Sequence, residues 1–161
     1  MELYLIRHAD ALALGERGVT TDEARPLSEK GETQSEAVAR ALAKRGVVLD
    51  RLCTSPLVRA RQTAEILLRV WARPELILET CDDLAPGSKP RKLGKYLLKS
   101  AGEKLGLVGH MPDLGEFAGW LLGEKKMQID FAKAGVAFIN CADFPGKGLG
   151  DLKWLVTPEW Y

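Results

Sequence analysis

Short apolar runs alternate along this chain with segments whose apolar residues recur at helical spacing. The first run, residues 1–6, carries apolar residues on both faces, which is typical of a buried parallel strand. Three further apolar runs predict strands over 47–54, 74–79 and 104–108. Strands that alternate with helices predict an α/β fold, a three-layer α/β/α sandwich around a mostly parallel sheet.

The helical segments between these runs have recognisable ends. Ser28 opens the first helix, which is expected to stop at Gly46. Ser55 and Pro56 precede the second helix, and Pro90 begins the third. The four helices are expected over 28–45, 55–71, 90–101 and 111–122.

The last part of the chain follows a different pattern. Two strand-like runs, 136–142 and 151–157, are joined by a loop rich in glycine. They predict a β-hairpin that adds an antiparallel edge to the sheet. The glycine-rich loop lacks the spacing of a phosphate-binding loop and no helix follows it, which favours a hairpin turn. The chain contains no internal repeat or linker, so we expect one domain over 1–161.

Composition excludes several classes of protein. The 23 Lys and Arg residues are nearly balanced by 22 Asp and Glu residues, which argues against a nucleic-acid binder. The three cysteines form no C-x-x-C spacing and are expected to be reduced thiols. The sequence has no signal-peptide pattern and no apolar stretch near the roughly 20 residues of a membrane helix. We therefore expect a cytoplasmic protein with no membrane and no nucleic-acid partner.

Basic and imidazole side chains follow three of the expected parallel strands. Arg7 and His8 come after the first strand, Arg59 lies in the helix after the second, and His110 follows the fourth. The carboxyl ends of such strands line the crevice in which open α/β sheets place ligands. Two guanidinium groups and an imidazole match the charge and the acceptor oxygens of a phosphoryl group, and helix N-termini add backbone donors.

The motifs around these residues resemble those of the histidine phosphatase superfamily, which has the phosphoglycerate-mutase-like fold. They are R-H-A at 7–9, S-P-L-V-R-A-R-Q-T-A at 55–64 and G-H at 109–110, in this order. The short chain is also similar to the SixA-type phosphohistidine phosphatases. This closer similarity lies in R-P-L-S-E-K-G at 25–31, G-H-M-P-D-L at 109–114 and W-L-V-T-P at 154–158. The resemblance covers nearly the whole chain.

The resemblance implies a role for each matching residue. His8 would be the nucleophile that becomes a phosphohistidine, Arg7 and Arg59 would hold the phosphoryl oxygens, and His110 would donate to one of them. Arg25 would contact substrate at the rim of the pocket, or it would anchor the long loop that precedes it through an ion pair. No cofactor is implied, and two histidines with scattered cysteines do not indicate a zinc site.

The sequence departs from the family at the general acid. Relatives that act on phosphate esters usually supply a carboxylic acid from the loop after the third strand. In residues 79–87 no glutamate aligns, and Asp83 is the nearest candidate, with Asp82 behind it; a plain turn role is the alternative. SixA-type members resemble this chain in lacking a clear acid, which is tolerable when the leaving group is an imidazole.

Three functions remain open on the sequence. The first is a phosphatase that acts on phosphohistidine in a partner protein, because the short loop after the third strand leaves few residues for a lid. The second is a small-molecule phosphomonoesterase, which would need Asp83 as an acid. The third is a non-catalytic phosphate-binding module, against which the complete set of Arg7, His8, Arg59 and His110 argues. A mutase would need an insertion to close the site, and the chain has none.

Other conspicuous side chains are expected to be structural. Arg61 should lie on the solvated face of its helix, and Asp113 should favour the N-terminus of the last helix. Trp120, Trp154 and Trp160 are expected in the core.

Overall fold

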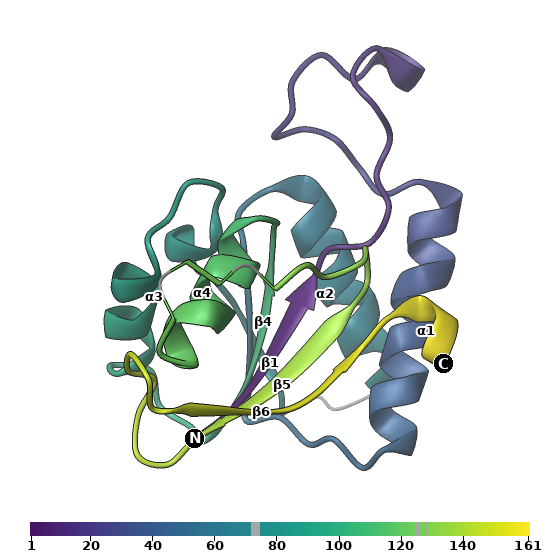
Figure 1. Ribbon diagram of the computed structural model, residues 1–161. Helices are drawn as coiled ribbons and strands as arrows, with labels where there is room; N and C mark the ends of the chain where they lie inside the picture. Colours follow the sequence, from purple (N-terminus) through teal and green to yellow (C-terminus); the bar gives the residue numbers. More distant parts are fainter. Residues whose placement is uncertain (72–74, 125, 128) are drawn as a thin grey trace.

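The computed structural model describes residues 1–71, 75–124, 126–127 and 129–161, and a six-stranded sheet forms its centre (Figure 1). The strands are β1 (Glu2–Arg7), β2 (Arg51–Thr54), β3 (Ile77–Thr80), β4 (Lys104–Gly109), β5 (Val136–Cys141) and β6 (Gly150–Val156). Their order in the sheet is β3-β2-β4-β1-β5-β6. The pairs β3–β2, β2–β4 and β4–β1 are parallel, whereas β5 runs antiparallel to β1 and β6 antiparallel to β5. The predicted parallel sheet with an antiparallel edge hairpin is confirmed.

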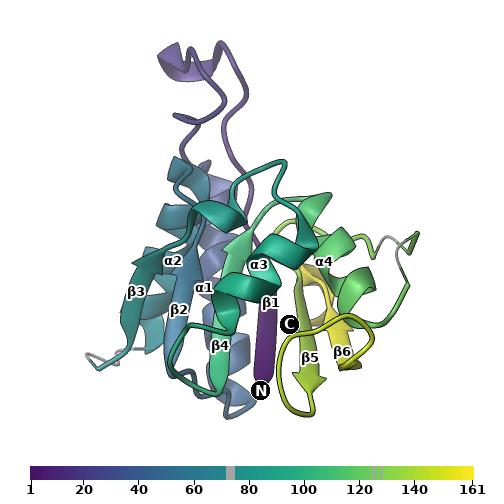
Figure 2. The same ribbon diagram turned by 90° about the vertical axis from the view of Figure 1, so that its left-hand side faces the viewer.

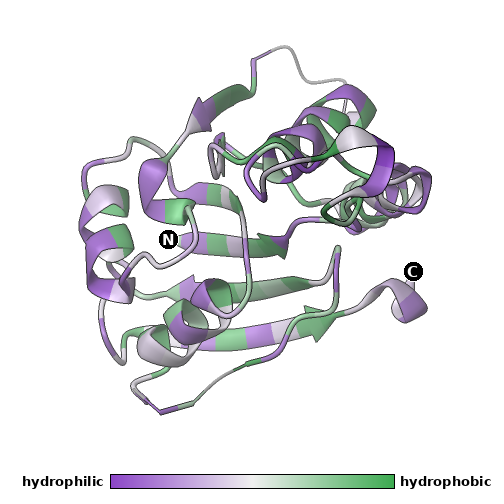
Figure 3. Ribbon diagram, turned by 90° about the horizontal axis from the view of Figure 1, so that it is seen from above, coloured by the Kyte–Doolittle hydropathy of each residue, from purple (hydrophilic) through white to green (hydrophobic). Residues whose placement is uncertain are grey.

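Helices cover both faces of the sheet, as Figure 2 shows. They are α1 (Glu29–Lys44), α2 (Val58–Trp71), α3 (Pro90–Leu97) and α4 (Asp113–Leu121). Residues of α1 and α2 belong to one buried apolar cluster, and residues of α3 and α4 belong to a second cluster. The central strands contribute to both clusters, and their apolar stretches are green in Figure 3. This arrangement confirms the three-layer α/β/α sandwich.

Several element bounds differ from those expected. The second strand begins at Arg51, not at residue 47, because the N–H of Val47 still bonds to the carbonyl of Leu42 at the end of α1. The third strand is β3, and residue 74, where it was expected to start, lies outside the described residues. The helix α2 begins at Val58, three residues later than expected, because the N–H of Ser55 bonds to the carbonyl of Val108 in β4.

The observed ends of α3 and α4 also differ from the predicted ends. The helix α3 ends at Leu97 rather than near residue 101, and α4 spans 113–121 rather than 111–122.

The prediction for Trp160 is wrong, since this residue is 77% exposed in the short helix at the C-terminus. All three cysteines are buried and have free thiols. No helix in the described part of the chain is long and apolar enough to cross a membrane.

The topology aligns three strand ends at one edge of the sheet. Arg7 of β1 pairs with Gly109 of β4, and Thr54 of β2 pairs with Val108, so the three strands finish at the same level. From this level β1 leads to α1 on one face, while β4 leads to α4 on the other face. Neighbouring strands whose connections leave in opposite directions open a crevice at their carboxyl ends.

A long loop, residues 10–27, rises from this edge and projects away from the sheet (purple in Figure 1). A bridge between Ala11 and Leu27 closes its base. The start of the loop also lies against α1 at Gly31, where a Cβ atom would come 1.9 Å from the carbonyl oxygen of Asp10. Only glycine allows so close an approach, so the R-P-L-S-E-K-G segment fixes where the loop leaves the core.

Candidate active site

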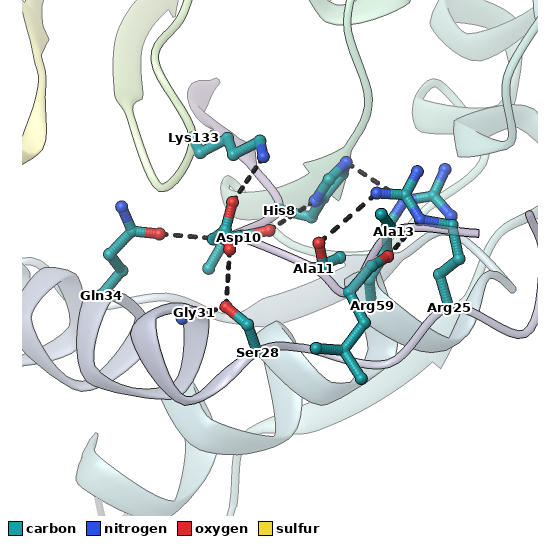
Figure 4. A network of polar contacts seen from close by, with 12 residues as sticks. His8, Asp10, Ala11, Ala13, Arg25, Ser28, Gly31, Gln34, Arg59 and Lys133 are labelled. Carbon is teal, nitrogen blue, oxygen red and sulfur yellow. Dashed lines mark hydrogen bonds and ion pairs between the residues drawn. The ribbon is translucent and has the colours of Figure 1, made fainter. Parts of the chain in front are cut away.

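The imidazole of His8 lies at the carboxyl end of β1 with both ring nitrogens engaged (Figure 4). Its Nδ1 is 2.7 Å from the carbonyl oxygen of Ala9, and its Nε2 is 3.2 Å from Nε of Arg59. A guanidinium can only donate, so Nε2 accepts that hydrogen bond and Nδ1 carries the proton that it donates to Ala9. These contacts leave the lone pair on Nε2, directed toward Arg59.

The surroundings of His8 keep its ring neutral. The residue is 8% exposed, and burial is the main reason that its pKa falls from 6.5 to about 4. The positive charges of Arg59, Arg7 and Lys133 lower the pKa further, while the Ala9 carbonyl opposes the shift. At neutral pH Nε2 is therefore unprotonated, as a nucleophile requires, and its lone pair accepts the hydrogen bond from Arg59.

His110 follows β4 and lies beside His8. Its Nε2 is 2.7 Å from the hydroxyl of Ser55, the residue that follows β2. Burial is the main reason that the pKa of His110 falls to about 3, and the titrating ring of His8 and the positive charge of Arg59 lower it further. Its Nδ1 is buried and has no hydrogen-bond partner within the described part of the chain.

Arg7 is the last residue of β1, and its side chain is bound by the segment that precedes β5, the neighbour of β1 on the side away from β4. One of its terminal nitrogens donates a short hydrogen bond to the carbonyl of Phe131, in the segment before β5. Its Nε is buried and, among the described residues, bonds to no acceptor. The guanidinium is thus fixed in place while one N–H is left to meet a ligand oxygen.

Arg59 lies in the first turn of α2 and is 5% exposed. Besides the contact from its Nε to His8, its two terminal nitrogens bind Asp22 of the long loop. One donates to the Asp22 carbonyl over 2.7 Å, and the other donates to a carboxylate oxygen over 2.9 Å. Two further residues of α2 bind the base of the long loop. The Gln62 side chain accepts a hydrogen bond from the N–H of Leu27, and the Thr63 hydroxyl accepts one from the N–H of Ala9.

Arg25 reaches the same aspartate from within the long loop. It donates from Nε to the carbonyl of Leu12 over 2.6 Å and from a terminal nitrogen to the other carboxylate oxygen of Asp22 over 3.0 Å. The structure therefore gives Arg25 the anchoring ion pair that was one of its two predicted roles. It also places Arg25 one carboxylate away from Arg59, so a contact with substrate remains a prediction.

Asp83 lies in the short helix after β3 and faces the site from the other side. It lines a small cavity of about 10 Å³ together with His110 and Asp113, a volume no larger than one water molecule needs. Its carboxylate forms an ion pair with Lys92 at 2.7 Å. A general acid must carry a proton, whereas this ion pair is made by the ionised carboxylate. Asp83 is thus near His110 but engaged elsewhere.

Three residues at the site were not predicted from the sequence. Ser55 was assigned only to a helix start, although its position directly after a parallel strand could have singled it out. Asp22 has no such signal, since it lies in the middle of an irregular loop. Lys133 has none either; its ammonium lies 2.5 Å from the carboxylate of Asp10, which also accepts from Ser28 over 2.6 Å (Figure 4).

The site is therefore a cluster of positively charged side chains around a neutral imidazole. The side chains of Arg7, His8, Arg59 and His110 come from three strand ends, as the sequence predicted, and Arg25 and Lys133 add positive charge around them. Within the described residues, no group of three or more His, Cys, Asp or Glu side chains could hold a metal ion.

Comparisons with known proteins agree with this arrangement. The model of the histidine phosphatase superfamily (branch 1) matches residues 3–86, which is more than half of the chain. An uncharacterized protein of Picosynechococcus sp. is 35% identical over 99% of this chain and 98% of its own length. The mitochondrial serine/threonine-protein phosphatase Pgam5 of Drosophila mojavensis is 33% identical over 53% of this chain, but the match spans only 28% of that protein.

Solved structures of similar fold include the protein histidine phosphatase SixA in complex with tungstate. It superimposes with a TM-score of 0.83 over 98% of this chain and 97% of SixA, at 24% identity. The SixA protein from Agrobacterium tumefaciens gives a TM-score of 0.79 over the same shares, at 22% identity. With the family model and the full-length relative, these matches lead to one conclusion: the chain belongs to the histidine phosphatase superfamily (branch 1) and is a phosphatase with a SixA-like fold.

Proposed function

We propose that this chain dephosphorylates phosphohistidine in a partner protein through a covalent phosphohistidine on His8. The observation that carries the proposal is the orientation of the His8 ring. With Nδ1 bonded to the Ala9 carbonyl, the lone pair of Nε2 faces a guanidinium that can hold the oxygens of a phosphoryl group.

The reaction follows from this orientation in two steps. Nε of Arg59 first moves its hydrogen bond from Nε2 to a phosphoryl oxygen. The Nε2 lone pair then attacks phosphorus, the P–N bond of the substrate breaks, and the departing imidazole takes a proton from solvent. Water then attacks the phosphorus on His8, the new P–N bond breaks, and orthophosphate leaves while Nε2 regains its lone pair. No group is left over, so His8 returns to its starting tautomer.

The arginines and His110 would stabilise the negative charge on the phosphoryl oxygens during both steps. Arg59 lies next to Nε2. Nε of Arg7 and Nδ1 of His110 are buried and have no hydrogen-bond partner among the described residues. Fixed donors in a site with little water stabilise developing negative charge without reorganising. Most catalysis of phosphoryl transfer consists of positioning and of such stabilisation.

We favour phosphohistidine as the substrate because of the state of Asp83, the candidate general acid. Asp83 is held by Lys92, so its carboxyl group is not placed to protonate an alkoxide. An imidazole departs more readily than an alkoxide and does not require that acid. The SixA structures support the same substrate class, since one of those proteins is described as a protein histidine phosphatase and holds tungstate.

A small-molecule phosphomonoesterase is the second candidate. Asp83 lines the same small cavity as His110, so a carboxyl group released from Lys92 would lie beside one member of the site. Structures of similar fold also include a phosphoserine phosphatase from Entamoeba histolytica, with a TM-score of 0.69 and 14% identity. That likeness concerns the fold, so the two candidates must be separated by kinetics.

The test is the dependence of kcat/KM on the pKa of the leaving group. Without an acid, alkyl phosphates should be cleaved about 10²–10⁴-fold more slowly than a phosphoramidate or a phosphohistidine protein, the range that general acid catalysis supplies. Asp83→Asn should leave phosphoramidate cleavage unchanged, and Asp82→Asn, an exposed neighbour, serves as the matched control. A flat dependence in the wild type that becomes steep only in Asp83→Asn would reject phosphohistidine in favour of a general phosphomonoesterase.

A further inference from the structure

Asp22 occupies the outward edge of the guanidinium of Arg59. Its carboxylate and its carbonyl oxygen accept from the two terminal nitrogens of Arg59, at 2.9 and 2.7 Å. Arg59 has five N–H groups, and with the contact to His8 three of them are in use. The side chain of Arg59 is almost fully buried, whereas that of Asp22 is 48% exposed, so the aspartate closes the arginine off from solvent.

The same carboxylate bridges two arginines. Oδ2 accepts from Arg59 and Oδ1 accepts from Arg25 over 3.0 Å. The hydrogen bond from Arg25 is the main cause that lowers the pKa of Asp22, with a further contribution from Arg59, so the carboxylate is charged at neutral pH. An anion with two oxygens, each on a different guanidinium, reproduces the contacts that a phosphoryl group would make.

A phosphoryl group on Arg59 and the carboxylate of Asp22 therefore compete. Both bind terminal N–H groups of Arg59, of which Asp22 already takes two of four, and two negative groups on one guanidinium repel each other. The competition is intramolecular, so it is present at every concentration of substrate. A bound phosphoryl group requires the carboxylate to leave Arg59.

The long loop allows this movement. Its base is fixed by the Ala11–Leu27 bridge, but residues 13–24 are exposed or half-buried and project from the molecule (Figure 1). Asp22 lies near the end of this stretch, one residue before Glu23, whose carbonyl accepts from the N–H of Val58. Withdrawal of the Asp22 side chain leaves both buried apolar clusters untouched, since no residue of 13–24 belongs to either.

We propose that Asp22 is a specificity-determining residue. Its carboxylate competes for Arg59 and so weakens the binding of free phosphate and small phosphate compounds at the phosphoryl subsite. The inference rests on the proposed function for the identity of that subsite. A phosphoryl group on a protein gains contacts with the exposed loop outside the pocket, and these contacts hold the loop with Asp22 withdrawn. Small phosphate compounds lack such contacts, so competition from the Asp22 carboxylate weakens their binding fully.

The size of the effect depends on how often Asp22 is withdrawn. The apparent Kd equals the intrinsic Kd divided by the fraction of molecules in the competent state. If Asp22 is withdrawn in about one molecule in ten, every free oxyanion binds about tenfold more weakly than the open site would allow. A substrate that stabilises the withdrawn loop recovers this factor.

The experiment measures the Kd of orthophosphate and of tungstate by calorimetry for the wild type, Asp22→Asn and Glu23→Gln. Both variants remove one negative charge from the same loop, but only Asp22 touches Arg59. We expect Asp22→Asn to bind both anions about tenfold more tightly, and Glu23→Gln to stay within about twofold of the wild type. In turnover, kcat/KM of Asp22→Asn should rise about tenfold for a small phosphoramidate and much less for a phosphohistidine protein.

Three results would overturn the inference. Weaker anion binding by Asp22→Asn would mean that Asp22 positions Arg59 for the ligand, and equal tightening in both variants would mean a general charge effect. An equal rise of kcat/KM for the small and the protein substrate would remove the role in specificity. Should the wild type cleave no phosphoramidate or phosphohistidine at all, the proposed function fails, while the anion affinities still test whether Asp22 occupies the subsite. If Asp22→Asn does not fold, Asp22→Glu, which is too long to keep both contacts, replaces it with the same expectation for anion binding.

Discussion

The imidazole rings of His8 and His110 lie with their centroids 4.9 Å apart and their planes tilted by 56°. Each ring is buried, burial is the main cause that lowers the pKa of each, and His8 lowers the pKa of His110 further. The only two histidines of the chain are therefore both neutral at physiological pH. The positive charge of the site comes from its arginines and from Lys133, which is the arrangement that an anionic substrate and a nucleophilic imidazole both need.

The two histidines should make stability depend on pH. Their pKa values in the folded protein are about 4 and about 3, against 6.5 in the unfolded chain. Below about pH 6.5 the unfolded chain binds protons that the folded chain does not, so the free energy of unfolding falls as the pH falls toward about 4. The slope should approach about 1.4 kcal/mol per pH unit for each histidine.

Denaturant unfolding between about pH 7 and about pH 5 measures this slope. The variant His8→Gln removes one of the two groups and should reduce the slope by about half. A free energy of unfolding that stays flat over the interval would contradict the neutral, buried state of both rings.

Replacing His8 should abolish turnover and leave the fold intact. Its ring hydrogen-bonds to the backbone carbonyl of Ala9 and to Arg59, and His8 itself belongs to neither apolar cluster. We expect His8→Ala to show no steady-state hydrolysis while its circular dichroism matches the wild type. In the wild type, acid-free quenching with labelled substrate should trap an adduct that is labile in acid and stable in base, as a phosphoramidate is. An acid-stable adduct would point to a serine or threonine nucleophile.

The arginines should differ according to their contacts. Arg59→Ala and Arg7→Ala should each reduce transition-state stabilisation by about 2–4 kcal/mol, measured from kcat/KM. Arg61 provides the matched control on the same helix, because it is exposed and only approaches Glu65 at 3.7 Å. Arg61→Ala should change kcat/KM by less than about twofold. A larger loss in Arg61→Ala than in Arg59→Ala would be incompatible with this site.

Ser55 should act as a positioning residue for His110. Its hydroxyl lies 2.7 Å from Nε2 of His110 and also accepts from the N–H of Leu57. Ser55→Ala should lower kcat by about tenfold with little change in KM, and should lower the free energy of unfolding by about 1 kcal/mol. Ser88→Ala removes another buried hydroxyl, one that bonds to nothing in the described residues, and should leave kcat unchanged without lowering the free energy of unfolding. Equal effects of the two variants on kcat would remove the positioning role.

Much of this molecule could be predicted from its sequence because the relevant information is local. Apolar runs on both faces marked β1 and β4 as buried strands, and the residues that follow a parallel strand must lie at the carboxyl edge of the sheet. For this reason Arg7, His8, Arg59 and His110 could be assigned to one site before the fold was known. Element bounds were less certain, since β2 begins where it meets its neighbours and not where its apolar run begins.

The tertiary structure alone decided how these side chains are held. Arg7 bonds to the carbonyl of Phe131, which lies 124 residues away, and Asp22 reaches Arg59 from 37 residues away across an irregular loop. Such contacts depend on how distant segments pack, and no periodicity in the sequence encodes them. The sequence thus determined which groups meet at the sheet edge, whereas the packing of the loop and of the segment before β5 determined their ring tautomer, their free N–H groups and the carboxylate that competes with substrate.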